Sequence, residues 1–255
     1  MTDAVMFGPD GNNVLPAAVL YKKNILALRG SFRPVTKVNL DMFEKSYDIF
    51  IRDPQVDQDN SIVIFEITLS NLKASGEIDE QDFMDRAELL CSLGHSVMIS
   101  KFQEYYKVVE YFNNFTKNRI GLTMGVNNLV DIFDEKYYRH LSGGILEAFG
   151  KLFFKDLQVY LYPMKNADTG QVMTSNNVKV HPRMKELYKF FKYNGKVMDI
   201  IDYEPEIMHI FSRDVLKRIM NGEEGWEEML PEGIAEIIKE KNLFTRKDAA
   251  VTEAK

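Results

Sequence analysis

The sequence contains little of several features that would assign a chain to a class at once. Only one of its 255 residues is a cysteine, Cys91, so a disulfide framework and a cysteine-based metal site are excluded and a reducing compartment is indicated. The longest apolar runs, such as residues 61–65, end after a few positions, far below the ~20 residues that cross a bilayer. Residues 1–4 have neither the basic nor the apolar region of a secretory signal. We therefore expect a cytoplasmic protein that does not enter a membrane.

Several charge and motif patterns are also missing. The 32 lysines and arginines are outnumbered by 38 aspartates and glutamates, and the net charge of −6 argues against a nucleic-acid-binding face. The four histidines (His95, His140, His181 and His209) are far apart in the sequence, so no metal site is predicted. There is no Gly-x-Gly-x-x-Gly dinucleotide motif, no Walker motif and no Gly-x-Ser-x-Gly elbow.

Short apolar runs alternate with longer helical patterns along the first two thirds of the chain. The runs lie at residues 24–28, 61–67, 96–100, 120–124 and 157–162. Helical patterns lie between them at residues 38–51, 79–93, 103–116 and 127–154, the last divided by Gly143-Gly144. Runs that are apolar at every position indicate strands buried on both faces. The sequence therefore predicts an α/β fold with a mostly parallel sheet and helical crossovers.

One edge of this sheet is expected to be antiparallel, and a second hairpin is expected later in the chain. Residues 17–21 can pair with residues 24–28 as an edge hairpin through Lys22 and Lys23, and residues 166–171 form the turn of a second hairpin between 157–162 and 171–180.

After Pro182 the apolar residues recur mainly at helical spacing, except for a strand signal at residues 197–201. We expect three parts: an α/β nucleotide- or phosphate-binding-like domain over residues 1–181, a helical C-terminal layer over residues 182–245, and a flexible tail over residues 246–255.

Ligands of open α/β sheets bind beyond the carboxyl ends of the strands, and this rule selects candidate site residues without any motif. The candidates are Ser31, Arg33, Glu66, Thr68, Ser100, Lys101, Thr123, Asn127 and Asn128. Glu66 stands out because a carboxylate within an apolar strand must be paired, hydrogen-bonded or at the rim of a polar cleft. One hypothesis is an α/β enzyme, including a partial or complete β/α barrel, in which Glu66 and Lys101 are the catalytic acid, base or anion-holding groups. A structural carboxylate remains the alternative.

The turn after the first parallel strand has the residue types of a phosphate-binding loop. Gly30 allows close backbone approach, and a helix begins near residue 38 with free N–H groups. The predicted nucleotide- or phosphate-binding residues are Gly30, Ser31, Arg33, Thr36, Lys37 and Asn39.

This turn resembles the nucleotide-binding signature of the HxGH adenylyltransferases, such as phosphopantetheine and nicotinate mononucleotide adenylyltransferase. That pattern reads Gly-Ser/Thr-Phe-Asp-Pro-x-His/Thr-x-Gly-His, and residues 30, 31, 32, 34 and 36 match it. Arg33 replaces the family's Asp, Val38 its Gly and Asn39 its second His, which contacts the triphosphate. The second signature, Ile-Ser-Ser-Thr-x-x-Arg, has a faint echo in residues 174–179. The resemblance implies ATP with Mg²⁺ as a substrate, and the departures imply weakened or lost catalysis.

Along its whole length the chain also resembles an uncharacterised bacterial family often labelled nicotinate nucleotide adenylyltransferase, within which it would correspond to the C-terminal part of a longer protein. The expected partner is a small-molecule nucleotide or phosphate ester. Aromatic residues at 188–193 would also suit contacts of a homo-oligomer. A non-enzymatic scaffold with a vestigial cleft is the alternative from another class.

Overall fold

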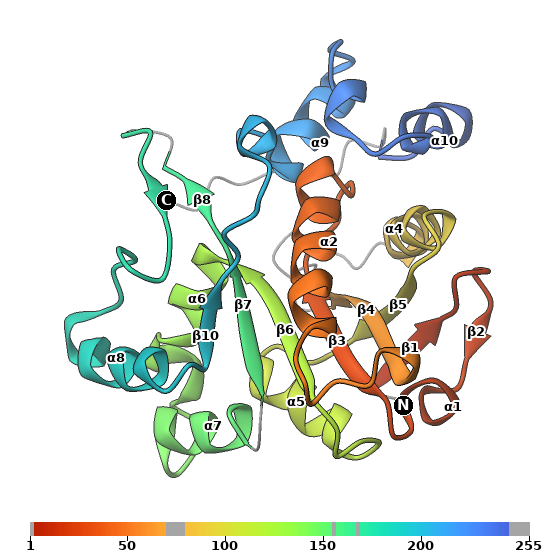
Figure 1. The fold of residues 1–255 in the computed structure, drawn as a ribbon. Helices are drawn as coiled ribbons and strands as arrows, with labels where there is room; N and C mark the ends of the chain where they lie inside the picture. The colour runs from red at the N-terminus through yellow and green to blue at the C-terminus, as the bar shows by residue number, and fades with distance from the viewer. Residues whose placement is uncertain (1–2, 70–79, 155–156, 167–168, 245–255) are drawn as a thin grey trace.

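The fold is built on an eight-stranded sheet (Figure 1), described by a computed structural model over residues 3–69, 80–154, 157–166 and 169–244. Its strands are β1 (Ala4–Phe7), β2 (Asn13–Val14), β3 (Asn24–Arg29), β4 (Ser61–Thr68), β5 (Ser96–Ser100), β6 (Ile120–Gly125), β7 (Gln158–Tyr162) and β10 (Val197–Asp199). They lie in the order β10-β7-β6-β3-β4-β5-β1-β2. The predicted tail at 246–255 lies outside the described residues.

Six of these strands are parallel and follow the doubly wound order. From β5 to β10 they run β5-β4-β3-β6-β7-β10, and every neighbouring pair among them is parallel. Numbered along the chain, this is the order 3-2-1-4-5-6, which reverses direction between β3 and β6. The five predicted runs are thus confirmed as strands of a mostly parallel α/β sheet. The barrel alternative is wrong, because in the described part of the chain the sheet is open, with β10 and β2 at its edges.

Both faces of the sheet are buried, as the continuous apolar runs predict. Along β3, Ile25 and Ala27 belong to one hydrophobic core, whereas Leu26 and Leu28 belong to the other, because successive side chains point to opposite faces. The first core is covered by α5 (Tyr105–Asn113), α6 (Val126–Ile132), α7 (Gly144–Leu152) and α8 (Lys185–Tyr193). The second is covered by α2 (Lys37–Ile51), α4 (Glu80–Ser92), α9 (Ser212–Asn221) and α10 (Ile234–Lys241).

The predicted edge hairpins need correction. Residues 16–20 form the short helix α1 (Pro16–Leu20) rather than a strand, since Pro16 occupies the first helical position, where its missing N–H costs nothing. The antiparallel edge is instead β1 paired with β2 and with β5. The second hairpin exists but pairs β8 (Met164–Lys165) with β9 (Val172–Met173), because β7 is an interior parallel strand; residues 167–168 of its turn lie outside the described residues.

The segment after residue 182 adds both helices and a strand. Between α8 and α9 the chain forms β10, which pairs with β7 at the edge of the sheet. The strand signal noted at residues 197–201 is confirmed, and α8 covers a different face from α9 and α10. Among the described helices, none combines the length and apolar character that a bilayer span requires.

Candidate functional site

A cavity of about 430 Å³ opens at the carboxyl ends of the central strands. Gly30 and Ser31, which follow β3, line one side of it, and Asn128 and Asp131 of α6, which follows β6, line another. Thr68 at the end of β4 and the segment after β5 complete the wall. The cavity therefore lies where the strand order reverses, the position at which doubly wound sheets bind their ligands.

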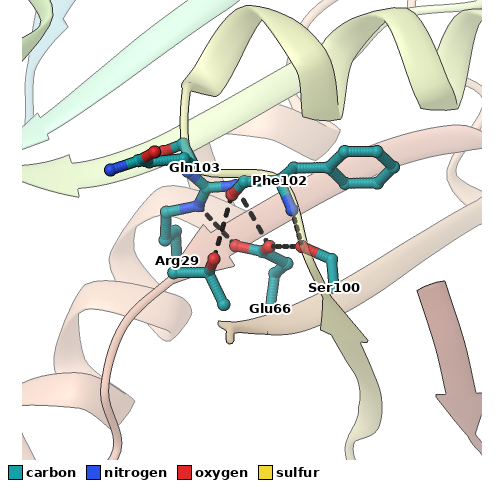
Figure 2. A network of polar contacts seen from close by, with 6 residues as sticks. Arg29, Glu66, Ser100, Phe102 and Gln103 are labelled. Atoms are coloured by element: carbon teal, nitrogen blue, oxygen red, sulfur yellow. Dashed lines mark hydrogen bonds and ion pairs between the residues drawn. The ribbon is translucent and has the colours of Figure 1, made fainter. Parts of the chain in front are cut away.

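A network of polar side chains and carbonyls (Figure 2) lies at this cavity, which two of its members, Arg29 and Gln103, line. The Arg29 guanidinium donates from Nε to Glu66 Oε2 at 2.5 Å and from Nη2 to Glu66 Oε1 at 3.0 Å. It also donates to the carbonyls of Phe102 at 3.0 Å and Gln103 at 2.9 Å, and the Ser100 hydroxyl donates to Glu66 Oε1. The network joins the carboxyl ends of three neighbouring strands, β3, β4 and β5.

Neither of the two residues predicted as catalytic, Glu66 and Lys101, lines the cavity. Glu66 is only 1% exposed, both its oxygens accept hydrogen bonds, and it does not line the cavity. Lys101 does not line it either: its side chain is 49% exposed and its Nζ lies 2.5 Å from Asp3 Oδ1. Burial alone would lower the pKa of Arg29, but the Glu66 carboxylate outweighs it and holds that pKa above its ordinary value. Arg29 and Glu66 thus form a mutually neutralised pair at the cavity.

The side chains lining the cavity are polar and partly acidic. Tyr105 is buried under the Arg29 guanidinium, 4.5 Å from the ring centroid, and its hydroxyl has no hydrogen-bond partner among the described residues. Burial raises the pKa of this phenol, so it stays protonated at neutral pH and can donate to a ligand. Burial also raises the pKa of the Asp131 carboxyl. The second acidic residue in the lining, Glu104, is paired, with its Oε2 2.7 Å from Lys107 Nζ. The cavity thus offers hydrogen-bonding groups, whereas its buried cation is already neutralised.

The turn between β3 and α2 is held rigidly beside the cavity. A Cβ on residue 30 would lie 2.8 Å from the Phe32 ring, so only glycine fits there. Phe32 is buried and packs 5.3 Å from the Phe65 ring centroid. Arg33 Nε donates to Asp82 Oδ1 on α4 at 2.7 Å. Arg86 on the same helix donates to Asp82 and to the Ser31 carbonyl, so α4 fastens the first half of the turn.

The remaining predicted phosphate-binding residues lie at the start of α2. Asn39 Oδ1 accepts hydrogen bonds from the Thr36 backbone N–H at 2.9 Å and from the Thr36 hydroxyl at 3.0 Å. Asn39, at the position of the family's second His, is therefore a helix-capping residue. Lys37 is exposed at the first helical position. Of the six residues, only Gly30 and Ser31 line the cavity; Arg33, Thr36, Lys37 and Asn39 lie beyond its rim.

Some site residues were missed from the sequence. Gln103, Glu104 and Tyr105 line the cavity shortly after β5, and the strand-end rule would have included them if extended by four residues beyond Lys101. Tyr137 and Tyr138 lie beyond α6, where the sequence gave no signal.

The echo of the second signature at residues 174–179 has a structural explanation. Ser175 is buried, and its N–H and hydroxyl donate to the Asp199 carboxylate of β10 at 2.8 and 2.6 Å. Figure 1 shows α9 next to one end of α2, and the backbone N–H of Glu204, before α9, donates to Asp41 in the first turns of α2 at 3.0 Å.

No group of three or more His, Cys, Asp or Glu residues in the described part of the chain is arranged to hold a metal. No protein-family model matches the chain, and no curated protein sequence matches it.

Among solved structures, the nicotinic acid mononucleotide adenylyltransferase of Plasmodium falciparum in complex with NaAD superposes with a TM-score of 0.50 and 13% identity, over 87% of this chain and 97% of that one. The same enzyme in complex with APC gives a TM-score of 0.49 at 13% identity, again over 87% and 97% of the two chains. The fold of this chain is therefore similar to that of an adenylyltransferase.

Proposed function

We propose that this protein binds a nucleotide or another phosphate ester at the carboxyl edge of its sheet, in an adenylyltransferase-like arrangement with weak or lost adenylyl transfer. One observation carries the proposal: a single cavity is lined both by the turn after β3 and by the helix after β6, at the reversal of a doubly wound sheet. The similarity of the fold to an adenylyltransferase is consistent with it.

The proposal divides ligand recognition between two neighbouring regions. The cavity receives the uncharged polar part of the ligand, because Tyr105, Ser31 and Asn128 offer hydrogen bonds there while Arg29 is already paired. The phosphates lie toward the start of α2, where Lys37 is exposed and the first N–H groups of the helix carry partial positive charge.

Catalysis is proposed to be weak because the residues at the family's catalytic positions have structural contacts here. Asn39 is neutral and uses its side-chain oxygen to cap α2, so it cannot supply a cationic imidazolium to the leaving pyrophosphate. Arg33, at the family's Asp, is bonded to Asp82. Loss of one preorganised donor to a developing anion typically costs ~10²–10³ in rate.

Binding is tested by isothermal titration calorimetry with ATP and Mg²⁺, using the unaltered protein, Lys37→Gln and the control Lys117→Gln. Lys117 is also exposed, but it precedes β6 and so lies at the amino ends of the strands, away from the cavity at their carboxyl ends. We expect Lys37→Gln to weaken ATP binding about tenfold, as for loss of one charge-assisted contact, and Lys117→Gln to leave it unchanged. Absence of saturable ATP binding, or equal effects of the two substitutions, would contradict the proposal and favour a scaffold.

Turnover is tested by pyrophosphate release with ATP and each acceptor: nicotinate mononucleotide, nicotinamide mononucleotide or phosphopantetheine. Turnover near one per second in the unaltered protein would refute weakened catalysis. The double variant Val38→Gly with Asn39→His restores the family pattern and should raise the rate. Because Asn39 caps α2, the stability of the double variant must be measured in parallel with its rate. Loss of the cap alone is expected to lower the free energy of unfolding by about 1 kcal/mol.

A further inference from the structure

A second cavity of about 430 Å³ lies on the other side of α6 from the candidate site. Its walls come from two short 3₁₀ turns that are distant in the sequence, one at residues 135–138 after α6 and one at residues 182–184 before α8. Buried Phe133 and Met184 contribute an apolar part of the lining. The candidate site uses neighbouring residues of the same segment, including Asp131 and Ile132, but the two linings share no residue.

The charged groups of this cavity are unevenly paired. Lys136 Nζ lies 2.7 Å from Asp134 Oδ2, and this hydrogen bond raises the pKa of Lys136 and lowers that of Asp134. Arg139 and Arg183 are exposed, and their guanidinium groups form no hydrogen bond or close ion pair within the described residues. Arg139 is nevertheless near enough to Asp134 to lower the pKa of that carboxyl further. Glu135 is the remaining acidic group in the lining. Three cations therefore face two carboxylates, and both guanidinium groups remain available to a ligand.

His181 adds a donor of defined orientation to the same wall. Its Nδ1 accepts a hydrogen bond from the backbone N–H of Arg183 at 3.4 Å. In the neutral ring the hydrogen is therefore on Nε2, which can donate to an anion. His181 and Arg183 come from one turn and Arg139 from the other, so a ligand held by all three would bridge the two turns.

We infer that this cavity is a binding site for a phosphate group, either free phosphate or the phosphate of a monoester. Guanidinium groups bind phosphate oxygens in bidentate geometry, and two of them with an imidazole N–H match the oxygens of one phosphate dianion. The apolar lining from Phe133 and Met184 can accept the organic part of an ester. This inference goes beyond the proposed function and does not depend on it, because it concerns a different cavity and different cations.

The experiment is a calorimetric titration with inorganic phosphate, and separately with phenyl phosphate, at constant ionic strength. The variants are Arg139→Gln, Arg183→Gln and their combination, with Arg52→Gln as the control, since Arg52 is an exposed arginine at the C-terminal end of α2. We expect each single substitution to weaken phosphate binding about tenfold, the double variant to abolish it, and the control to have no effect. Tighter binding of phenyl phosphate, also lost in the double variant, identifies an ester as the ligand, whereas equal affinities identify free phosphate.

Two further results decide whether the site is placed correctly. All three arginines are exposed, so the variants should unfold at the same midpoint as the unaltered protein. If a variant unfolds at a lower midpoint, His181→Gln serves as an additional variant and should weaken phosphate binding severalfold. Phosphate affinity unchanged in the double variant, or lost in Lys37→Gln instead, would place the anion at the start of α2 and overturn the inference. Failure of ATP to bind, by contrast, would count only against the proposed function.

Discussion

Replacing Arg29 by Met tests whether Glu66 holds the fold together or is an accessible acid. The Arg29 side chain makes four hydrogen bonds, two to Glu66 and one each to the carbonyls of Phe102 and Gln103, and both charged side chains are over 90% buried. Without Arg29, the Ser100 hydroxyl is the one hydrogen-bond donor left to the Glu66 carboxylate among the described residues. Breaking one partner of a buried ion pair typically costs about 3–5 kcal/mol, because the other charge stays buried and unpaired. We expect a loss of that size in the free energy of unfolding.

A double-mutant cycle isolates the pair from other effects of the substitution. Glu66→Leu alone should also destabilise by several kcal/mol, whereas Arg29→Met combined with Glu66→Leu should cost less than the sum, with a coupling energy of about 2–3 kcal/mol. Urea unfolding followed by circular dichroism, and by the fluorescence of the single tryptophan, Trp226, measures the free energy and shows whether the two probes coincide. Lys101→Met is the control: its exposed ion pair with Asp3 should contribute under about 1 kcal/mol.

The reasoning is refuted if Arg29→Met costs less than about 1 kcal/mol and its effect simply adds to that of Glu66→Leu. That result would mean that Glu66 is solvated and unpaired in solution, and its candidacy as a catalytic acid would be restored. A large coupling energy would instead confine Glu66 to positioning the loop at residues 101–104.

Three further predictions concern single positions. Burial lowers the pKa of His95, so as the pH drops the unfolded chain takes up the proton before the folded protein does, and stability should fall below pH 6.5. In thermal unfolding measured over a range of pH, His95→Phe should reduce this loss of stability, whereas the control His209→Asn should not. Asn39→Ala removes the acceptor that caps α2 and should cost about 1 kcal/mol in urea unfolding; no change would mean that the cap is replaced by water. Gly121→Ala would place a Cβ 2.7–3.2 Å from three buried side chains and should destabilise the protein by about 1–3 kcal/mol. Gly150→Ala, within α7 and with open space around it, should stabilise the protein by up to about 1 kcal/mol. A more stable Gly121→Ala than Gly150→Ala would contradict the packing described here.

The parallel core of the fold could be predicted because its signal is local. Strands buried on both faces need apolar residues at nearly every position, and the five runs have them. The edges could not be predicted in the same way. β1 has four residues and β2 only two, too few for a period to be visible, and α1 replaced the expected strand because a single proline set its start.

The contacts of the site depend on strand register, which the sequence does not contain. The pairing of β3 with β4 sets Arg29 directly opposite Glu66, and the pairing of β4 with β5 sets Thr68 opposite Ser100. A shift of one residue in the first pairing would move the carboxylate to the other face of the sheet and leave both charges unpaired. The strand-end rule selected the edge of the sheet at which the cavity lies and several residues that line it, including Ser31, Thr68 and Asn128, but it could not show that Glu66 is bonded to Arg29 and Ser100.

The structure also changes how much the resemblance at the β3–α2 turn says about chemistry. Gly30 is required because a side chain there would collide with Phe32, and Thr36 is used with Asn39 to cap α2. Both residues therefore have a structural reason that does not depend on nucleotide binding. Ser31 and Lys37 are different, since their exposed side chains have no evident structural contact in the described part of the chain. Substitution of Ser31 or Lys37 therefore tests the proposed ligand binding without first disturbing the fold.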